Sequence, residues 1–215
     1  MKRTILRHCK CGTRIGLHQT ECFFCRRESA TQKRLSVDVL PDSVPKLLKK
    51  HIPLISSRND LEFDKKVSGG SFYLHGPAGA GKSHQAALYL SLLLKSSNKY
   101  HGEWINIPKF LFDLRQLYSR KDVPREQSEE ALVEKYSKVP YLVLDDLGVE
   151  KTSDWANLIL YLIINERYEN ERSVIITSNL SVEELGEKMG DDRIPSRIMG
   201  MCEVAEINGE DRRRR

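Results

Sequence analysis

Short apolar runs alternate with longer amphipathic stretches over the last two thirds of the chain. The runs predict strands near residues 71–75, 102–107, 140–145, 173–178 and 202–207. The spacing of apolar positions between them predicts helices near 84–96, 108–119, 126–137, 153–170 and 181–188. Strands and helices that alternate in this way favour a parallel sheet with helices on both faces. The pattern therefore predicts an α/β fold with a parallel five-stranded sheet.

A glycine-rich octapeptide follows the first predicted strand directly. Residues 76–83, GPAGAGKS, match the phosphate-binding pattern G-x-x-x-x-G-K-S/T, and a predicted helix comes next. Glycines let backbone N–H groups converge on phosphate oxygens, and the start of a helix adds the positive end of its dipole. We expect Lys82 to reach the β- and γ-phosphates of a nucleotide and Ser83 to ligate magnesium. The predicted nucleotide-binding residues are Gly76, Pro77, Ala78, Gly79, Ala80, Gly81, Lys82, Ser83 and His84.

Polar residues follow the third and fourth predicted strands. Asp145 and Asp146 come after the apolar residues of YLVL, and Asn179 comes after the strand near 173–178. In open parallel sheets the carboxyl ends of the strands are where ligands bind. Asp145 is the expected magnesium partner, and Asp146 can polarise the attacking water. Asn179 could orient that water or contact the γ-phosphate, although an asparagine before Ser181 also fits a helix cap.

Two arginines lie four residues apart near the last predicted strand, in the run DRIPSRI. Arg193 and Arg197 would share one face of a helix, although Pro195 limits how regular that helix is. A free Arg197 could reach the phosphates of a neighbouring subunit. The alternative is an ordinary salt bridge at the edge of the sheet.

Four of the five cysteines lie close together near the N-terminus, as Cys9-x-Cys11 and Cys22-x-x-Cys25. Two close pairs can present four thiolates tetrahedrally to one zinc ion, and so short a segment needs a metal to fold. The spacing therefore predicts a structural zinc site of all four cysteines. The alternative is four free thiols in a flexible segment.

These features divide the chain into a zinc-binding head (1–29), a linker (30–42) and a nucleotide-binding domain (43–215) that opens with a helix near 43–51. No apolar run approaches the ~20 residues of a membrane-spanning helix. The basic N-terminus also lacks the apolar segment of a secretory signal. We therefore expect a cytoplasmic protein that does not bind membranes.

The net charge of +5 is unevenly distributed. Residues 1–36 contain nine Lys or Arg and two acidic residues, and the chain closes on four arginines. Basic segments suit a polyanion such as nucleic acid, and the alternative is that they serve solubility. Within the domain, Lys109, Arg115, Arg120 and Lys121 could follow a DNA backbone or form a solvated face.

Residues 70–200 resemble the AAA+ helicase loaders of the DnaC type and the related IstB-type transposition helper ATPases. The resemblance rests on GPAGAGKS, YLVLDDLGVEK, INERYENERSVIITSNLS and DRIPSRI. It implies a P-loop NTPase of the AAA+ (ASCE) class, to which the cysteine spacing adds a small zinc-ribbon-like module at the N-terminus. By this resemblance Lys82 and Ser83 are the Walker A residues, Asp145 and Asp146 the Walker B pair, Asn179 the sensor, and Arg197 the arginine finger. Arg193 is the second choice for the finger, and Arg167 would have a structural or intersubunit role.

The sequence departs from the AAA+ pattern in three ways. Asp146 stands where most AAA+ proteins have glutamate, which implies slow hydrolysis. The helical lid that follows the fifth strand in many AAA+ proteins is expected to be missing, as it is in loaders of this type. The head is shorter than many loader N-terminal domains.

The resemblance implies an ATP-dependent loader of a replicative DNA helicase, acting in the initiation of DNA replication. Its expected ligands are ATP, magnesium, zinc and single-stranded DNA, and it is expected to self-associate when ATP is bound. One alternative is a transposition helper ATPase that acts on duplex DNA. Another is an adaptor that binds ATP without hydrolysing it.

Overall fold

The structure, a computed structural model, describes residues 7–8, 14–15, 40–46, 48–49, 70–96, 101–117, 124, 128–149 and 153–208. The chain divides into two compact units, residues 1–36 and 37–215. In the first unit, strand β1 (Arg7–His8) pairs antiparallel with β2 (Arg14–Ile15). The four cysteines predicted to bind zinc lie outside the described residues.

Five parallel strands form the sheet of the second unit, in the order β4-β5-β6-β3-β7. They are β3 (Ser71–His75), β4 (Gly102–Asn106), β5 (Tyr141–Leu147), β6 (Val174–Ser178) and β7 (Cys202–Glu206). The predicted parallel five-stranded sheet is confirmed, with each strand close to its predicted position. Since the strands are parallel, their carboxyl ends meet at one edge. Strand β6 lies between the strand that precedes the glycine-rich loop and the strand that ends in the two aspartates.

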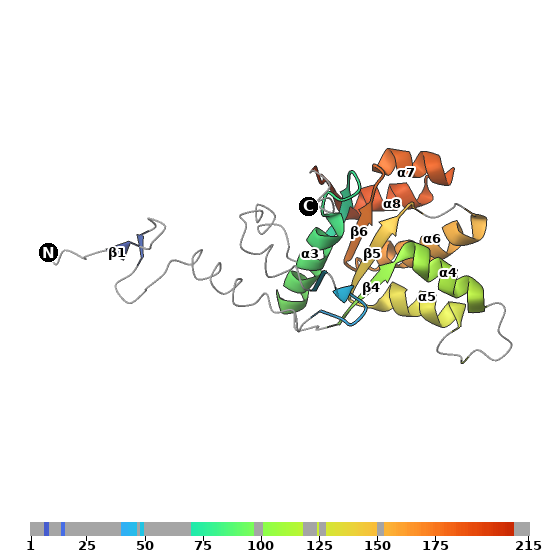
Figure 1. The fold of residues 1–215 in the computed structure, drawn as a ribbon, viewed down its shortest axis with the longest axis horizontal. Helices are drawn as coiled ribbons and strands as arrows, with labels where there is room; N and C mark the ends of the chain where they lie inside the picture. The colour runs from blue at the N-terminus through green and yellow to red at the C-terminus, as the bar shows by residue number, and fades with distance from the viewer. Residues whose placement is uncertain are drawn as a thin grey trace. The chain divides into compact units, whose positions relative to one another are not determined.

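Helices cover both faces of this sheet. They are α3 (Lys82–Ser96), α4 (Ile107–Leu117), α5 (Glu129–Lys138), α6 (Asp154–Glu169), α7 (Val182–Met189) and α8 (Arg193–Met201). Helix α3 lies on one side of the sheet, and α4 and α6 lie on the other (Figure 1). Among the described helices, none has the length and apolar character needed to cross a bilayer.

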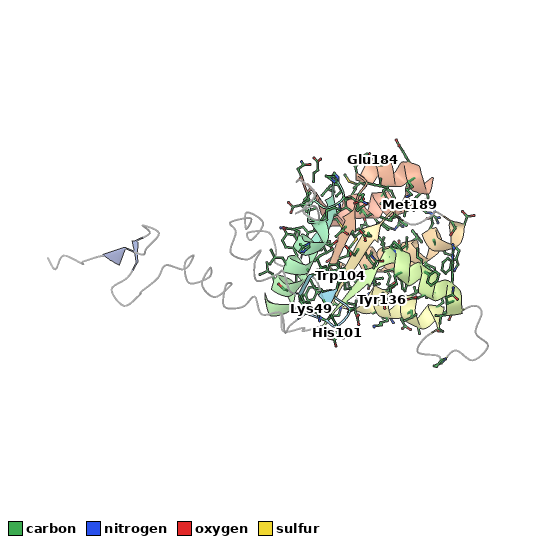
Figure 2. All side chains as sticks on the ribbon, in the orientation of Figure 1. Lys49, His101, Trp104, Tyr136, Glu184 and Met189 are labelled. Atoms are coloured by element: carbon green, nitrogen blue, oxygen red, sulfur yellow. The ribbon has the colours of Figure 1, made fainter. Side chains whose placement is uncertain are left out.

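The core forms two layers because successive side chains of a strand point to opposite faces. In β5, Leu142 and Leu144 belong to the layer packed with α4, α5, α6 and α8, whereas Val143 belongs to the layer packed with α3. Trp104 of β4 also packs in the α3 layer (Figure 2). The α3 layer includes Leu48, whose backbone N–H donates to the carbonyl of Pro45 at 3.0 Å, within the predicted helix near 43–51.

Helix α8 is not among the helices predicted from the spacing of apolar positions, although the sequence placed Arg193 and Arg197 on one face of a helix whose regularity Pro195 would limit. Pro195 is the third residue of α8. Backbone N–H groups in the first turn have no acceptor inside the helix, so the proline ring removes no hydrogen bond. Arg193 and Arg197 therefore lie one turn apart on α8.

Arg167 of α6 is fully buried and joins three elements of the fold. Burial, together with the charge of Arg172, lowers the pKa of Arg167 to about 9, so its guanidinium stays protonated at neutral pH. The hydrogen bonds of this arginine all end on backbone carbonyl oxygens, which fits the structural one of the two roles expected for it. The acceptors are the backbone carbonyl groups of Tyr136 (2.9 Å), Ser137 (3.3 Å), Val139 (2.8 Å), Pro140 (3.2 Å) and Ser173.

Candidate nucleotide-binding site

The glycine-rich loop turns sharply between the end of β3 and the first residue of α3 (Figure 1). Gly76 has a φ of 141°, and a Cβ atom at this position would lie 2.4 Å from the backbone oxygen of Ile207. Only glycine allows the loop to pass this close to the chain that follows β7. The loop therefore leads directly into the N-terminus of α3, where unpaired N–H groups and the helix dipole favour an anion.

Lys82 is the first residue of α3 and is 6% exposed. Its ammonium group donates to the backbone oxygens of Gly76 and Pro77 and to Oδ1 of Asn179, each at 2.8 Å. These partners hold the charge of Lys82 inside the turn of the loop. Phosphate oxygens are stronger acceptors than neutral oxygens, so this position suits a nucleotide phosphate.

Ser83 and Asp145 meet where α3 begins and β5 ends. The Ser83 hydroxyl donates to Oδ1 of Asp145 at 2.8 Å, and the Thr177 hydroxyl donates to the same oxygen at 2.7 Å. Burial raises the pKa of the Asp145 carboxyl above its ordinary value; the hydrogen bond from Thr177 opposes this, and the charge of Asp146 adds to it. A hydroxyl beside a carboxylate supplies the oxygen ligands that magnesium prefers. Ser83 and Asp145 are therefore the pair that would hold this ion, which would offset the cost of burying the carboxylate.

Asp146 lies at an irregularity in β5. Its φ is 63°, and the register with β6 shifts between Leu144 and Leu147. A regular strand would point Asp145 and Asp146 to opposite faces. Here the Asp146 backbone N–H donates to the Thr177 hydroxyl at 3.0 Å, and its Oδ2 accepts from the Asn106 amide at 3.1 Å. The half-buried Asp146 carboxylate is thereby held at the same edge of the sheet as Asp145.

Asn179 reaches the loop because β6 is the neighbour of β3 in the sheet. Its side-chain oxygen accepts from Lys82 at 2.8 Å. The cap of α7 is not Asn179 but Ser181, which forms a capping box with Glu184. The asparagine side chain is therefore available to the site rather than used as a helix cap.

Arg197 lies on α8 and contacts α6 rather than the glycine-rich loop. It donates to Oδ1 of Asn165, to the backbone oxygen of Arg193 at 3.0 Å and to the Tyr161 hydroxyl at 3.1 Å. Arg193, in contrast, forms an ion pair with Asp191 at 2.7 Å. The structure thus brings Lys82, Ser83, Asp145, Asp146 and Asn179 together, and the contacts described for Arg197 do not join this group.

The family comparison agrees with this geometry. The model of the family described as IstB-like ATP binding protein matches residues 63–215. The chain belongs to this family.

The curated relatives of this chain include replicative helicase loaders and an insertion sequence ATP-binding protein. The replicative helicase loader DnaI of Bacillus subtilis is 24% identical over 163 residues, which are 70% of this chain and 50% of DnaI. DnaC, the replicative helicase loader of Escherichia coli K12, is 28% identical over 138 residues, 64% of this chain and 52% of DnaC. The "Putative insertion sequence ATP-binding protein" of Sinorhizobium fredii is 28% identical over 178 residues, 81% of this chain and 55% of that protein. The chain spans about half the length of these relatives.

Solved structures share the fold. The crystal structure of the DnaC helicase loader matches with a TM-score of 0.57 and 24% identity, over 85% of this chain and 99% of that one. AMPPCP-bound DnaA from Aquifex aeolicus matches with a TM-score of 0.55 and 16% identity, over 84% of this chain and 52% of that one. The fold is that of the AAA+ domains of DnaC and DnaA.

Two residues of the site were not predicted from the sequence. Thr177 bridges Asp145 and Asp146 through one hydroxyl, and Asn106 contacts Asp146 from the end of β4. Both are polar residues at the carboxyl end of a predicted strand, which is the signal that could have found them. Thr177 and Asn106 contact the two aspartates because β5 lies between β4 and β6, and the residue pattern does not predict this strand order.

Part of the predicted DNA-contacting group lies on α4. Lys109 forms an exposed ion pair with Asp113 at 2.6 Å, and the Arg115 guanidinium lies 5.3 Å from the centre of the Trp155 ring. Arg120 and Lys121 lie outside the described residues. Both described basic residues are therefore on the surface of α4.

Proposed function

We propose that this protein is an ATP-dependent loader of a replicative DNA helicase, cytoplasmic, and active as an assembly of several copies on single-stranded DNA. The observation that carries the proposal is the joining of Lys82, Ser83, Asp145, Asp146 and Asn179 at one edge of the sheet. The likeness to two helicase loaders, DnaI and DnaC, supports the choice of partner.

ATP binding uses the loop and the start of α3. Lys82 exchanges its neutral acceptors for oxygens of the β- and γ-phosphates, while the backbone N–H groups at the start of α3 bind phosphate. Ser83 and Asp145 would hold magnesium, and the bound ion would neutralise charge on the phosphates. Because the buried Lys82 exchanges neutral acceptors for anionic ones, ATP should bind strongly and its binding should depend on the triphosphate.

Hydrolysis needs an aligned water molecule at the γ-phosphate. Asp146 accepts a proton from this water, and Asn106 keeps the Asp146 side chain in place through its 3.1 Å hydrogen bond. Asn179, released from Lys82 when ATP binds, contacts the γ-phosphate or the water. An aspartate is shorter than the glutamate common in AAA+ proteins, so we expect slow turnover.

Arg197 completes the site of a neighbouring copy. Its hydrogen-bonding partners are neutral, whereas Arg193 is already paired with the carboxylate of Asp191. Arg197 is therefore the better candidate to stabilise phosphate charge in the transition state. Arg197→Ala should preserve ATP binding and reduce hydrolysis only in the assembled state.

ATP hydrolysis by the purified chain tests the proposal when measured alone, with single-stranded DNA and with duplex DNA, each with and without the replicative helicase of the same organism. A loader should bind the helicase stably and respond to single strands. Lys82→Ala serves as the inactive control. A chain that ignores both the helicase and single strands is not a loader.

The second candidate is a transposition helper that acts on duplex DNA. The family match and the likeness to an insertion sequence ATP-binding protein over 81% of this chain favour it. This candidate predicts ATP-dependent binding to duplex DNA, hydrolysis stimulated by duplex alone, and no helicase complex.

The N-terminal unit is proposed to hold structural zinc through Cys9, Cys11, Cys22 and Cys25. Support comes from the spacing of the cysteines and from the antiparallel pairing of β1 with β2, which in the sequence lie on either side of Cys9 and Cys11. One zinc ion per chain, lost in Cys22→Ser and Cys25→Ser proteins, is the expected result of metal analysis. Zinc content unchanged by both substitutions would contradict the assignment.

A further inference from the structure

The guanidinium of Arg197 contacts side chains of α6 and is partly buried. Its Nε donates to Oδ1 of Asn165, and its Nη2 donates to the Tyr161 hydroxyl at 3.1 Å. The guanidinium carbon also lies 4.7 Å from the centre of the Tyr161 ring, a cation–π distance. The Asn165 amide nitrogen in turn donates to Oε1 of Glu169 at 2.9 Å, which directs the Asn165 oxygen toward Arg197.

These contacts leave part of the guanidinium available. An arginine has five N–H groups, of which Nε carries one and each terminal nitrogen two. The Nε–H group donates to Asn165. One N–H of Nη2 donates to Tyr161, and one N–H of Nη1 donates to the backbone oxygen of Arg193 at 3.0 Å. Within the described part of the chain, one N–H group on each terminal nitrogen of Arg197 is not used in these hydrogen bonds. Donors on the two terminal nitrogens can pair with phosphate oxygens.

The partners of Arg197 are also electrically neutral. An amide, a phenol and a backbone carbonyl orient the guanidinium without cancelling its charge, so it can still act on a distant anion. Arg193 stacks on the same Tyr161 ring at 4.8 Å, but both oxygens of Asp191 accept hydrogen bonds from it. Asp191 also interacts electrostatically with Arg197, but its hydrogen bonds go to Arg193, so Arg197 is the arginine on this ring whose hydrogen-bond partners are all neutral.

We propose that Asn165 and Tyr161 are positioning residues for the arginine finger: they hold Arg197 so that its two remaining N–H groups face the γ-phosphate bound by a neighbouring copy. This inference rests on the proposed role of Arg197 and adds the elements that orient it. An arginine has four rotatable side-chain bonds, and fixing it before the neighbour binds reduces the entropy lost on reaching the transition state.

The test measures ATP hydrolysis by the full chain, under conditions in which sedimentation shows ATP-dependent assembly on a single-stranded oligonucleotide. Tyr161→Phe removes one hydrogen bond and keeps the ring, and Asn165→Ala removes the acceptor of Nε. We expect each to lower kcat about tenfold with KM for ATP changed less than about twofold, since only the transition state is affected. Tyr168→Phe is the matched control. Its ring is 6.0 Å from Arg197, and its hydroxyl makes no hydrogen bond within the described part of the chain.

Double variants separate positioning from general structural damage. If Asn165 and Tyr161 act through Arg197, adding Asn165→Ala or Tyr161→Phe to Arg197→Ala lowers kcat no further. Multiplied losses in the double variants, or a KM for ATP that rises with the loss of kcat, would overturn the inference. Single variants with normal kcat beside an impaired Arg197→Ala protein would overturn it and leave the finger assignment standing. Normal hydrolysis by the assembled Arg197→Ala protein would overturn both.

Discussion

Asp145→Asn should stabilise the nucleotide-free protein while it abolishes magnesium-dependent binding of ATP. Asp145 is 5% exposed, and its Oδ1 accepts from Ser83 and Thr177 at 2.8 and 2.7 Å. An asparagine oxygen keeps both donors. Each bond changes from a charge-assisted one of about 1.5–3 kcal/mol to a neutral one of about 0.5–1.5 kcal/mol, a total loss of about 2–3 kcal/mol.

The free energy gained by no longer burying the charge of Asp145 outweighs this loss of hydrogen-bond energy. Burying an ion costs several kcal/mol, and the nearby Asp146 charge adds repulsion. That the pKa of Asp145 is raised shows that these two effects exceed the benefit of its hydrogen bonds. We expect a midpoint of thermal unfolding higher by a few degrees at pH 7, since 1 kcal/mol corresponds to about 2–4 °C in a domain of this size.

The pH dependence follows from the same shift. A carboxyl group whose pKa is raised by folding binds more protons in the folded state, so it lowers stability as pH rises from about 4, the ordinary value for aspartate, through the raised pKa. The stability difference between the Asp145→Asn protein and the unaltered one should therefore be largest above this window and vanish below it.

The assay is thermal unfolding with and without magnesium and ATP. At a ligand concentration 100 times Kd, binding adds about 2.7 kcal/mol to the unaltered protein. The Asp145→Asn protein should gain little, whereas Asp146→Asn, the control, should keep the gain. The reasoning is refuted if Asp145→Asn lowers stability at pH 7 by more than about 1 kcal/mol, the size of one ordinary hydrogen bond. It is also refuted if the protein keeps its response to magnesium and ATP.

Three further substitutions test other parts of the account. Gly76→Ala places a Cβ 2.4 Å from the Ile207 oxygen and should weaken ATP binding at least about tenfold in calorimetry, because the loop must move. Arg167→Met leaves buried carbonyl groups without donors and should lower the free energy of unfolding by about 3–5 kcal/mol in urea. Asn106→Ala frees the Asp146 carboxylate and should lower kcat about tenfold with little change in KM for ATP.

Each of these substitutions has a control or a result that would count against it. Gly190→Ala introduces the same residue at a positive φ with no atom within 4 Å, so it should leave ATP binding intact. Arg167→Lys offers fewer donors and should recover only part of the stability; full recovery would show that charge alone matters. A kcat for Asn106→Ala equal to that of the unaltered protein would remove Asn106 from the mechanism.

The residue pattern predicted the strands and the glycine-rich loop because both depend on residues that are neighbours in the sequence. It did not predict how the strands lie side by side, and the contacts of Asn106 and Thr177 with the two aspartates depend on that order. Pro195 made the regularity of helix α8 hard to predict. Because this proline lies in the first turn, it removes no hydrogen bond of the helix. The family resemblance already favoured Arg197 over Arg193, but the neutral hydrogen-bond partners of Arg197 on α6 lie more than 30 residues away in sequence, so the structure was needed to find them.

Transfer of the helicase onto a closed circle of single-stranded DNA tests the central claim most directly. A ring-shaped helicase has no free end to thread on such a circle, so unwinding of an annealed oligonucleotide reports active loading. The account predicts unwinding with the unaltered chain and ATP, and none when Lys82→Ala protein replaces it. Equal unwinding with Lys82→Ala protein, or none with the unaltered chain, would contradict the account.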